Sequence, residues 1–244
     1  MNYKAVLQYD GTRYRGWQTQ GNTDNTIQGK LETLLTKMAG EPVEVNGSGR
    51  TDAGVHAAGQ VISFRCKTKE SPEEICRYMN EYLPEDIAVL TVEEAAPRFH
   101  ARLNAVRKTY VYRIWNAPVK NVFRRRFTTW IQKPLDLDAM EQAATLLCGT
   151  HDYRAFCSQK KFKKSTVRTI EKIEIGKMGQ EIRISYTGDG FLYHMVRILT
   201  GTLVEMGLGL RKPEEMTEIL EGQDRTKAGR LMPPEGLTLE SVEY

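Results

Sequence analysis

The sequence Gly47-Ser48-Gly49-Arg50-Thr51-Asp52-Ala53-Gly54-Val55-His56-Ala57 lies between two runs in which apolar and polar residues alternate. Such alternation is typical of half-buried strands, and the glycines between the runs favour a tight loop that joins them. Glycine also lets the backbone turn sharply and come close to a ligand. Arg50 and Asp52 are two residues apart, so both side chains point to the same side of an extended segment.

The pair Arg50 and Asp52 has two interpretations. In one, the loop is an ordinary glycine hairpin with an ion pair on its surface. In the other, the guanidinium keeps the Asp52 carboxylate ionised, and an ionised carboxylate is a nucleophile or a base. A phosphate-cradling P-loop is excluded, because no Gly-Lys-Ser/Thr follows the glycines.

Basic residues are unevenly distributed along the chain. Its 244 residues carry a net charge of only +4, yet nine Lys and Arg and no Asp or Glu lie between Arg98 and Arg126. Six more, again without an acid, lie between Arg154 and Ile170. Such runs can form a solvated face, but their interleaving with aromatic residues favours a nucleic-acid footprint. The candidate RNA contacts here are Arg124, Arg125, Arg126, Lys160, Lys161, Lys163 and Lys164.

Composition also limits the expected cofactors and compartment. The four cysteines show no CxxC spacing and no histidine pair accompanies them, so we expect no metal. No nucleotide-binding motif occurs, so we expect no organic cofactor. His56 and His194 are expected to be hydrogen-bonded structural residues. The N-terminus enters a strand pattern directly and no long apolar run follows, which predicts a soluble, cytoplasmic protein without membrane contact.

The periodicities predict an α+β fold in two halves. Residues 1 to about 100 give strand, helix, strand, strand, helix, strand, which is the ferredoxin-like order, and the second half gives nearly the same order. We expect an N-terminal α+β domain over residues 1–103 and a C-terminal one over 104–244. The expected strands are 3–9, 43–46, 55–66, 87–92, 109–115, 166–175, 181–187 and 237–244, with a bulge near Gly59. The expected helices are 27–38, one opened by a capping box at 71–74, 136–148, 191–206 and 213–220.

Four further segments contain compact motifs of glycine, aromatic and charged residues. They are Tyr9-Asp-Gly-Thr-Arg-Tyr-Arg-Gly-Trp-Gln18, Lys108-Thr-Tyr-Val-Tyr-Arg113, Gly188-Asp-Gly-Phe-Leu-Tyr-His-Met-Val-Arg197 and the C-terminal 233–244. In the first, Arg13, Arg15 and Trp17 offer guanidinium and aromatic surfaces suited to RNA. The alternative for Trp17 is a plug that fixes the loop onto the core. Tyr110, in the second motif, also suits a strand core.

Together with residues 47–57, these segments resemble the motifs of the TruA-type tRNA pseudouridine synthases over nearly the whole chain. The resemblance implies isomerisation of uridine to pseudouridine at positions 38, 39 and 40 of the tRNA anticodon stem-loop. It implies that Asp52 is the catalytic aspartate, that Tyr110 contacts the substrate, and that Arg197 lies near the aspartate. We assign Arg50 to RNA contact. The resemblance further implies a homodimer whose chains each hold two α+β halves that share one mixed, mainly antiparallel sheet with a central cleft.

Two questions stay open at this level. Asp52 can attack C1′ of the ribose, attack the uracil, or abstract a ribose proton, and the sequence does not choose among these. The competing class is a non-catalytic RNA-binding protein, which shares the basic and aromatic segments but has no need for Asp52. Glycosidic hydrolysis uses similar acid–base groups, but the motifs contain no second carboxylate to activate water.

Overall fold

The alternation at the start of the chain forms the strand β1 (Asn2–Tyr9) in the computed structural model, which describes residues 1–244. Tyr3, Ala5, Leu7 and Tyr9 are buried, as the pattern requires. The chain divides into two units. The first comprises Met1–Val106 and Thr238–Tyr244, and the second comprises Arg107–Leu237.

The first unit has the predicted ferredoxin-like order of elements. After β1 come α1 (Ile27–Ala39), β2 (Val45–Gly47), β3 (His56–Arg65), α2 (Pro72–Tyr82) and β4 (Ile87–Glu94). In the sheet, β1 lies between β4 and β3, β2 pairs with β3, and all these pairs are antiparallel. The register of β1 against β3 shifts between Leu7 and Tyr9, opposite residues 57–60, which confirms the bulge near Gly59.

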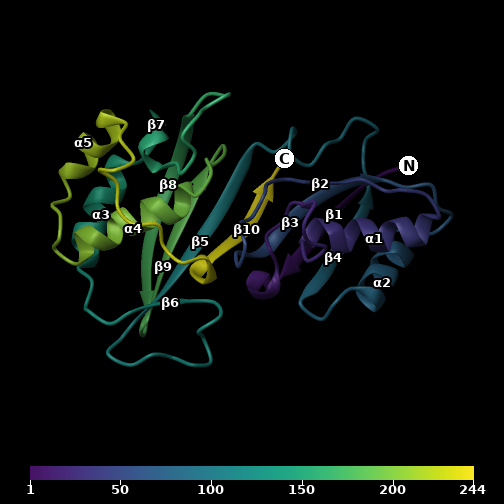
Figure 1. Ribbon diagram of the computed structural model, residues 1–244, viewed down its shortest axis with the longest axis horizontal. Helices are drawn as coiled ribbons and strands as arrows, with labels where there is room; N and C mark the ends of the chain where they lie inside the picture. The colour runs from purple at the N-terminus through teal and green to yellow at the C-terminus, as the bar shows by residue number, and fades with distance from the viewer. The chain divides into compact units, whose positions relative to one another are not determined.

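Local signals set the ends of both helices in this unit. The Thr26 side chain caps α1 by accepting a hydrogen bond from the Gly29 N–H, and Gly40 ends the helix with a φ of 70°. Ser71 and Glu74 form the predicted capping box of α2. The two helices contact each other, α1 contacts β2 and α2 contacts β4, as Figure 1 also shows.

The last strand, β10 (Leu237–Glu243), pairs in parallel with β3. Thr238 lies opposite His56 and Leu239 opposite Ala57, and β10 runs beside β3 in Figure 1. A Cβ on Gly59 would overlap the carbonyl oxygen of Glu240, so glycine is needed where the two strands meet. Residues 238–244 therefore belong with the first unit, whereas the sequence placed them with the second half. The boundary expected at 103 lies close to that at Val106.

The second unit is also a mixture of strands and helices. Its elements are β5 (Arg107–Asn116), β6 (Thr129–Ile131), α3 (Leu137–Leu146), β7 (Gly149–Asp152), β8 (Val167–Met178), β9 (Glu181–Gly188), α4 (Met195–Gly207) and α5 (Glu215–Gly222). Three short 3-10 turns lie at Gly11–Arg13, Arg154–Phe156 and Pro234–Gly236 of the chain. The strands β5, β9, β8 and β7 are adjacent in that order and antiparallel, and β6 joins β5 in parallel.

Helix α4 is the core helix of the second unit. Of its residues, only Glu205 is not buried, and α3, α4 and α5 gather on one side of the strands in Figure 1. A Cβ on Gly201 would overlap the carbonyl oxygen of Arg230, so this glycine lets the segment before Met232 lie directly on the helix. No helix of the chain combines the length and the apolar character that a membrane span requires.

Two features of the second unit differ from the sequence prediction. The strands β6 and β7 were not predicted, because three or four residues are too few to show a period. Helix α4 begins at Met195, whereas the apolar pattern predicted a start at Phe191. The physical reason is His194, whose φ of 65° is incompatible with a right-handed helix.

Candidate functional site

Asp52 is the first residue of a tight four-residue turn. The Val55 N–H donates a hydrogen bond to the Asp52 carbonyl oxygen (3.1 Å), and Gly54, the third residue of the turn, has a φ of 79°. A type II turn requires this conformation at its third position, where glycine is favoured. Asp52 is half-buried and Arg50 is exposed. The turn therefore fixes the backbone position from which the Asp52 side chain extends at the surface of the first unit.

Thr51 fixes the other side of Asp52 through two hydrogen bonds. Its hydroxyl lies 2.9 Å from the Tyr9 hydroxyl, and its carbonyl oxygen accepts a hydrogen bond from the backbone N–H of Trp17 (3.0 Å). Both partners come from the end of β1 and the loop after it. The Asp52 backbone is thus held by Thr51 on one side and by its own bond to Val55 on the other, which gives it the preorganisation that a nucleophile or base needs.

A buried network continues from Thr51 into the core. The amide nitrogen of Gln60 donates to the Tyr9 hydroxyl (3.4 Å) and to the Gly49 carbonyl oxygen (3.0 Å), and its amide oxygen accepts from the Ser48 hydroxyl (2.6 Å). Burial raises the pKa of Tyr9 to about 12, so its hydroxyl keeps its proton at neutral pH. Since that hydroxyl accepts from Gln60, its own proton is available to Thr51.

The loop after β1 packs closely against the Asp52 turn. A Cβ on Gly11 would overlap the Val55 carbonyl oxygen, and one on Gly16 would lie 2.9 Å from the Thr51 carbonyl oxygen. The Trp17 ring is only 2% exposed, and a Cβ on Gly47 would overlap it. The loop thus encloses the Trp17 ring, and the structure supports packing, not RNA contact, as the function of Trp17.

Arg13 and Arg15 lie at the surface of the same loop, as expected of RNA contacts. Arg13 is already engaged, because its Nε and Nη2 donate to one carboxylate oxygen of Asp86 at 2.9 and 2.7 Å. The Tyr14 hydroxyl donates to the other oxygen of Asp86. Burial, followed by the hydrogen bond to Asp86, raises the pKa of Tyr14.

His56 is a structural residue, as predicted. Its ring is buried, and its Nδ1 accepts a hydrogen bond from the Gly11 N–H at 3.0 Å. This contact joins the start of β3 to the loop after β1. His194 is also hydrogen-bonded as predicted, since its Nδ1 lies 2.9 Å from the Ser158 hydroxyl.

Tyr110 and Arg197 belong to the second unit. The Tyr110 ring is 9% exposed and meets the edge of the Phe191 ring, with centroids 5.2 Å apart and an interplanar angle of 82°. Arg197 is 8% exposed, and its Nε donates to the Met232 carbonyl oxygen at 2.7 Å. Arg197 therefore does not face solvent, although it is a charged residue. A buried guanidinium with a fixed hydrogen bond is an anchored positive charge.

The second tyrosine of the same strand, Tyr112, serves the fold. It is fully buried, and its hydroxyl donates to the Pro233 carbonyl oxygen (2.7 Å) and lies 2.6 Å from the Thr129 hydroxyl. Burial raises its pKa. A Cβ on Gly236 would lie 2.6 Å from the Tyr112 ring, so the C-terminal motif is shaped around this side chain.

The candidate RNA-binding residues of the second unit lie at its surface, although not all are equally available. Arg124, Arg125 and Arg126 are exposed. The Arg124 guanidinium pairs with Glu181, a buried carboxylate that also binds Arg183. One Arg125 nitrogen donates to the Val122 carbonyl oxygen (2.7 Å). In the other cluster Lys160, Lys161, Lys163 and Lys164 are all exposed.

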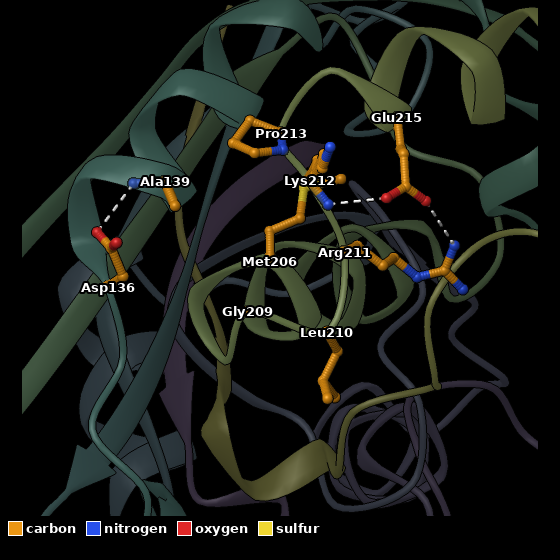
Figure 2. A pocket seen from close by; sticks show the side chains of 9 residues that line it. All are labelled: Asp136, Ala139, Met206, Gly209, Leu210, Arg211, Lys212, Pro213 and Glu215. Atoms are coloured by element: carbon orange, nitrogen blue, oxygen red, sulfur yellow. Dashed lines mark hydrogen bonds and ion pairs between the residues drawn. The ribbon is translucent and has the colours of Figure 1, made fainter.

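A pocket of about 460 Å³ lies elsewhere on the second unit, between the start of α3, the end of α4 and the start of α5 (Figure 2). None of the predicted site residues lines it. Its charged groups serve the fold: Asp136 caps α3, Glu215 accepts from the Lys212 N–H (2.8 Å), and Arg211 Nε donates to Glu205 (2.7 Å). We therefore do not assign chemistry to this pocket. No group of three or more His, Cys, Asp or Glu side chains in the chain could hold a metal ion.

The predicted residues thus divide between the units, with Arg50 and Asp52 in the first and Tyr110 and Arg197 in the second. Sequence reasoning missed Ser48, Gln60 and Thr51 as supports of the turn. The available signal was Gln60, a polar residue inside the largely apolar run 55–66, whereas Ser48 and Thr51 lie in the loop among glycines and charged residues.

Comparison with known proteins gives concordant results. A family model described as tRNA pseudouridine synthase matches residues 5–104 and 143–244. The tRNA pseudouridine synthase A of Bacillus sp. (strain KSM-64) is 48% identical over 243 residues, which cover 100% of this chain and 99% of that protein. The tRNA pseudouridine synthase A of Brevibacillus brevis is 46% identical over 241 residues, covering 99% and 98%.

Among solved structures, a chain from "Crystal Structure of a Cbf5-Nop10-Gar1 Complex" aligns with a TM-score of 0.41 and 12% identity. The alignment covers 97% of this chain and 48% of that chain. At this level of similarity the match adds nothing to the sequence comparisons.

The network beneath the Asp52 turn predicts the effect of Tyr9→Phe. Removing the hydroxyl takes away the partner of the Thr51 hydroxyl and one of the three hydrogen-bond partners of Gln60, so the free energy of unfolding should fall by about 1–3 kcal/mol. Urea denaturation measures this. Tyr82→Phe is the control, because the Tyr82 side chain is exposed and removal of its hydroxyl should leave the midpoint unchanged. Equal midpoints for wild type and Tyr9→Phe would contradict the network.

Proposed function

Because the chain belongs to the family of tRNA pseudouridine synthases, we propose that it isomerises uridines 38, 39 and 40 of the tRNA anticodon stem-loop with Asp52 as its catalytic residue. The family and its named relatives establish the coarser activity, which is that of an isomerase acting on uridine in tRNA. The positions modified and the residue roles are our proposal.

The reaction needs few groups from the protein. The bond between ribose C1′ and uracil N1 breaks, the base turns, and C1′ joins C5. The proton at C5 leaves and N1 gains one, so no atoms or electrons are gained or lost overall. One ionised carboxylate can begin this sequence by attacking C1′, by attacking the uracil, or by abstracting a ribose proton.

The fixed turn at Asp52 is the observation that carries the proposal. Hydrogen bonds hold the residue before Asp52 at both its hydroxyl and its carbonyl, and the Asp52 carbonyl closes the turn onto Val55. A carboxylate with an immobilised backbone reaches the reacting atom at little entropic cost. A surface ion pair would not need this support.

We propose that Tyr110, Arg197 and Arg50 bind the substrate. A stacked base must leave the helix before it can react, and an aromatic side chain then grips it by stacking. Phe191 holds the Tyr110 ring edge-on, which supports this role. The Met232 carbonyl oxygen holds the Arg197 guanidinium, so Arg197 presents a charge that does not reorganise. Arg50 is exposed and suits a phosphate contact.

We also propose that the protein acts in the cytoplasm as a homodimer that builds one RNA site from both subunits. The basic residues occur in two separate segments, 98–126 and 154–170, which supports an RNA-binding surface that extends over more than one region of the protein. Sedimentation at working concentration distinguishes the two assembly states, and a fully active monomer would contradict the dimer. Cell fractionation tests the compartment.

Asp52→Asn should abolish pseudouridine formation and leave tRNA binding nearly intact. The substitution keeps the size and hydrogen bonding of the side chain but removes its charge, and with it the nucleophile and base. We expect the single-turnover rate to fall by orders of magnitude. Nucleoside chromatography of the tRNA measures the product, and a binding isotherm measures the affinity.

Asp24→Asn is the matched control, because Asp24 is an exposed carboxylate in a loop of the same unit. It should leave the rate unchanged, and circular dichroism checks the fold of both variants. An Asp52→Asn variant that retains more than about a tenth of the wild-type rate (roughly 1.4 kcal/mol) would remove Asp52 from the mechanism.

The lysine cluster at residues 160–164 should contribute to the salt dependence of tRNA binding. Each Lys→Gln substitution that removes an interaction with a phosphate should reduce the slope of log affinity against log salt by roughly 0.7–0.9. Arg124→Gln should change the slope less than Lys160→Gln, because the Arg124 guanidinium is paired with the buried carboxylate of Glu181. Lys177→Gln, at an exposed site on β8, is the control. Unchanged affinity and slope after neutralising the cluster would mean that the footprint lies elsewhere.

A further inference from the structure

Tyr193 lies between β9 and α4, and the proposed function does not use it. Its side chain is 55% exposed, and its ring stacks on the His194 imidazole with centroids 3.7 Å apart and 27° between the planes. An exposed aromatic side chain usually samples several rotamers, whereas contact along one face restricts this one. A ring that is immobile on one face and open to solvent elsewhere is preorganised for stacking.

His194 holds this arrangement in an unfavourable backbone conformation. Its φ of 65° is uncommon for a residue other than glycine. Such conformations persist only where the surroundings over-determine them, and they cluster at functional sites. Here the His194 Nδ1 lies 2.9 Å from the Ser158 hydroxyl, and the Ser158 N–H donates to the Tyr193 carbonyl oxygen at 3.3 Å. Two hydrogen bonds from one serine therefore fix both residues.

Ser158 also links the Tyr193 backbone to the start of a cationic segment. The exposed lysines at 160, 161, 163 and 164 follow it directly in the chain. Within the same segment, the Arg154 guanidinium lies 5.8 Å from the centroid of the half-exposed Phe162 ring. Cations beside an open aromatic face are the combination that single-stranded nucleic acid requires, since cations meet phosphates and the ring meets a base.

We propose that Tyr193 stacks on an unpaired base of the tRNA anticodon loop while the lysines at 160–164 bind phosphates of the adjoining nucleotides. This inference rests on the proposed function, which names the anticodon stem-loop as the substrate. In an A-form stem the faces of the bases are covered by their neighbours, so a loop is where an aromatic ring finds a free base. Tyr193 is then a residue that determines where the RNA docks, distinct from the residues proposed for the reaction.

The test uses full-length tRNA carrying 2-aminopurine in the anticodon loop, whose fluorescence reports stacking. Tyr193→Leu removes the ring and should weaken binding about tenfold or more, and it should abolish the fluorescence change that wild type produces. Tyr193→Phe keeps the ring and should behave as wild type, and Tyr193→Trp should bind at least as tightly. Tyr82→Leu is the matched control, because Tyr82 is also 55% exposed and its ring contacts that of Tyr78. It should leave binding and fluorescence unchanged.

Equal affinity and fluorescence for wild type and Tyr193→Leu would overturn the inference. A Tyr193→Leu variant that sediments as a smaller species with unchanged RNA affinity would also overturn it, because the ring would then serve contact between copies of the chain. Pseudouridine formation by the wild type is measured in the same preparations. Its presence together with an unaffected Tyr193→Leu variant contradicts only this inference. If the wild type forms no pseudouridine while Tyr193→Leu abolishes the fluorescence change, the result contradicts the proposed function and not this inference.

Discussion

The pair of hydrogen bonds at Thr51 is the constraint on which the candidate site depends. The hydroxyl meets Tyr9 at the end of β1 and the carbonyl oxygen meets the Trp17 N–H. Through these bonds the strand and loop at the start of the chain fix the position of the Asp52 backbone. Gly11 and Gly16 permit the close approach, because any side chain there would collide with the backbone of the turn. The motif around residues 9–18 therefore supports the aspartate, besides offering Arg13 and Arg15 to solvent.

In the second unit, too, contacts within the unit fix side chains that bind the substrate, or support a residue that binds it, in our proposals. The Met232 carbonyl oxygen holds Arg197, Phe191 holds Tyr110, and Ser158 holds His194. Each supporting residue lies in a segment other than the element that carries, or follows, the residue it supports. Long polar side chains with fixed partners lose less entropy on binding than free ones, so this arrangement favours a specific RNA geometry.

Much of the fold could be predicted because its signals are local. The Thr26 cap, the Ser71–Glu74 capping box and the alternation of β1 are each contained within a few residues. The partner of β10 could not be predicted, since nothing in the last eight residues indicates which strand they join. The start of α4 was missed because a single histidine does not specify a positive φ, and the contact of His194 with Ser158 lies 36 residues away in the sequence.

The site was predictable as a set of motifs but not as a structure. Asp52 stood out through its glycine-rich surroundings, whereas the network of Ser48, Gln60 and Tyr9 joins segments that are far apart in the sequence. For Trp17 the sequence left RNA contact and core packing open, because composition does not distinguish a ring that binds RNA from one that fills a core.

Release of tritium from C5 of uridine tests whether this protein isomerises uridines 38, 39 and 40. Joining C1′ to C5 displaces the proton at C5, so full-length tRNA labelled at C5 should release tritium to water in step with pseudouridine formation. A transcript without uridine at positions 38, 39 and 40 should release none. We expect the RNA to stay intact and no free uracil to form. Retention of all the tritium by the uridine-containing tRNA, or the appearance of free uracil, would contradict the proposed function.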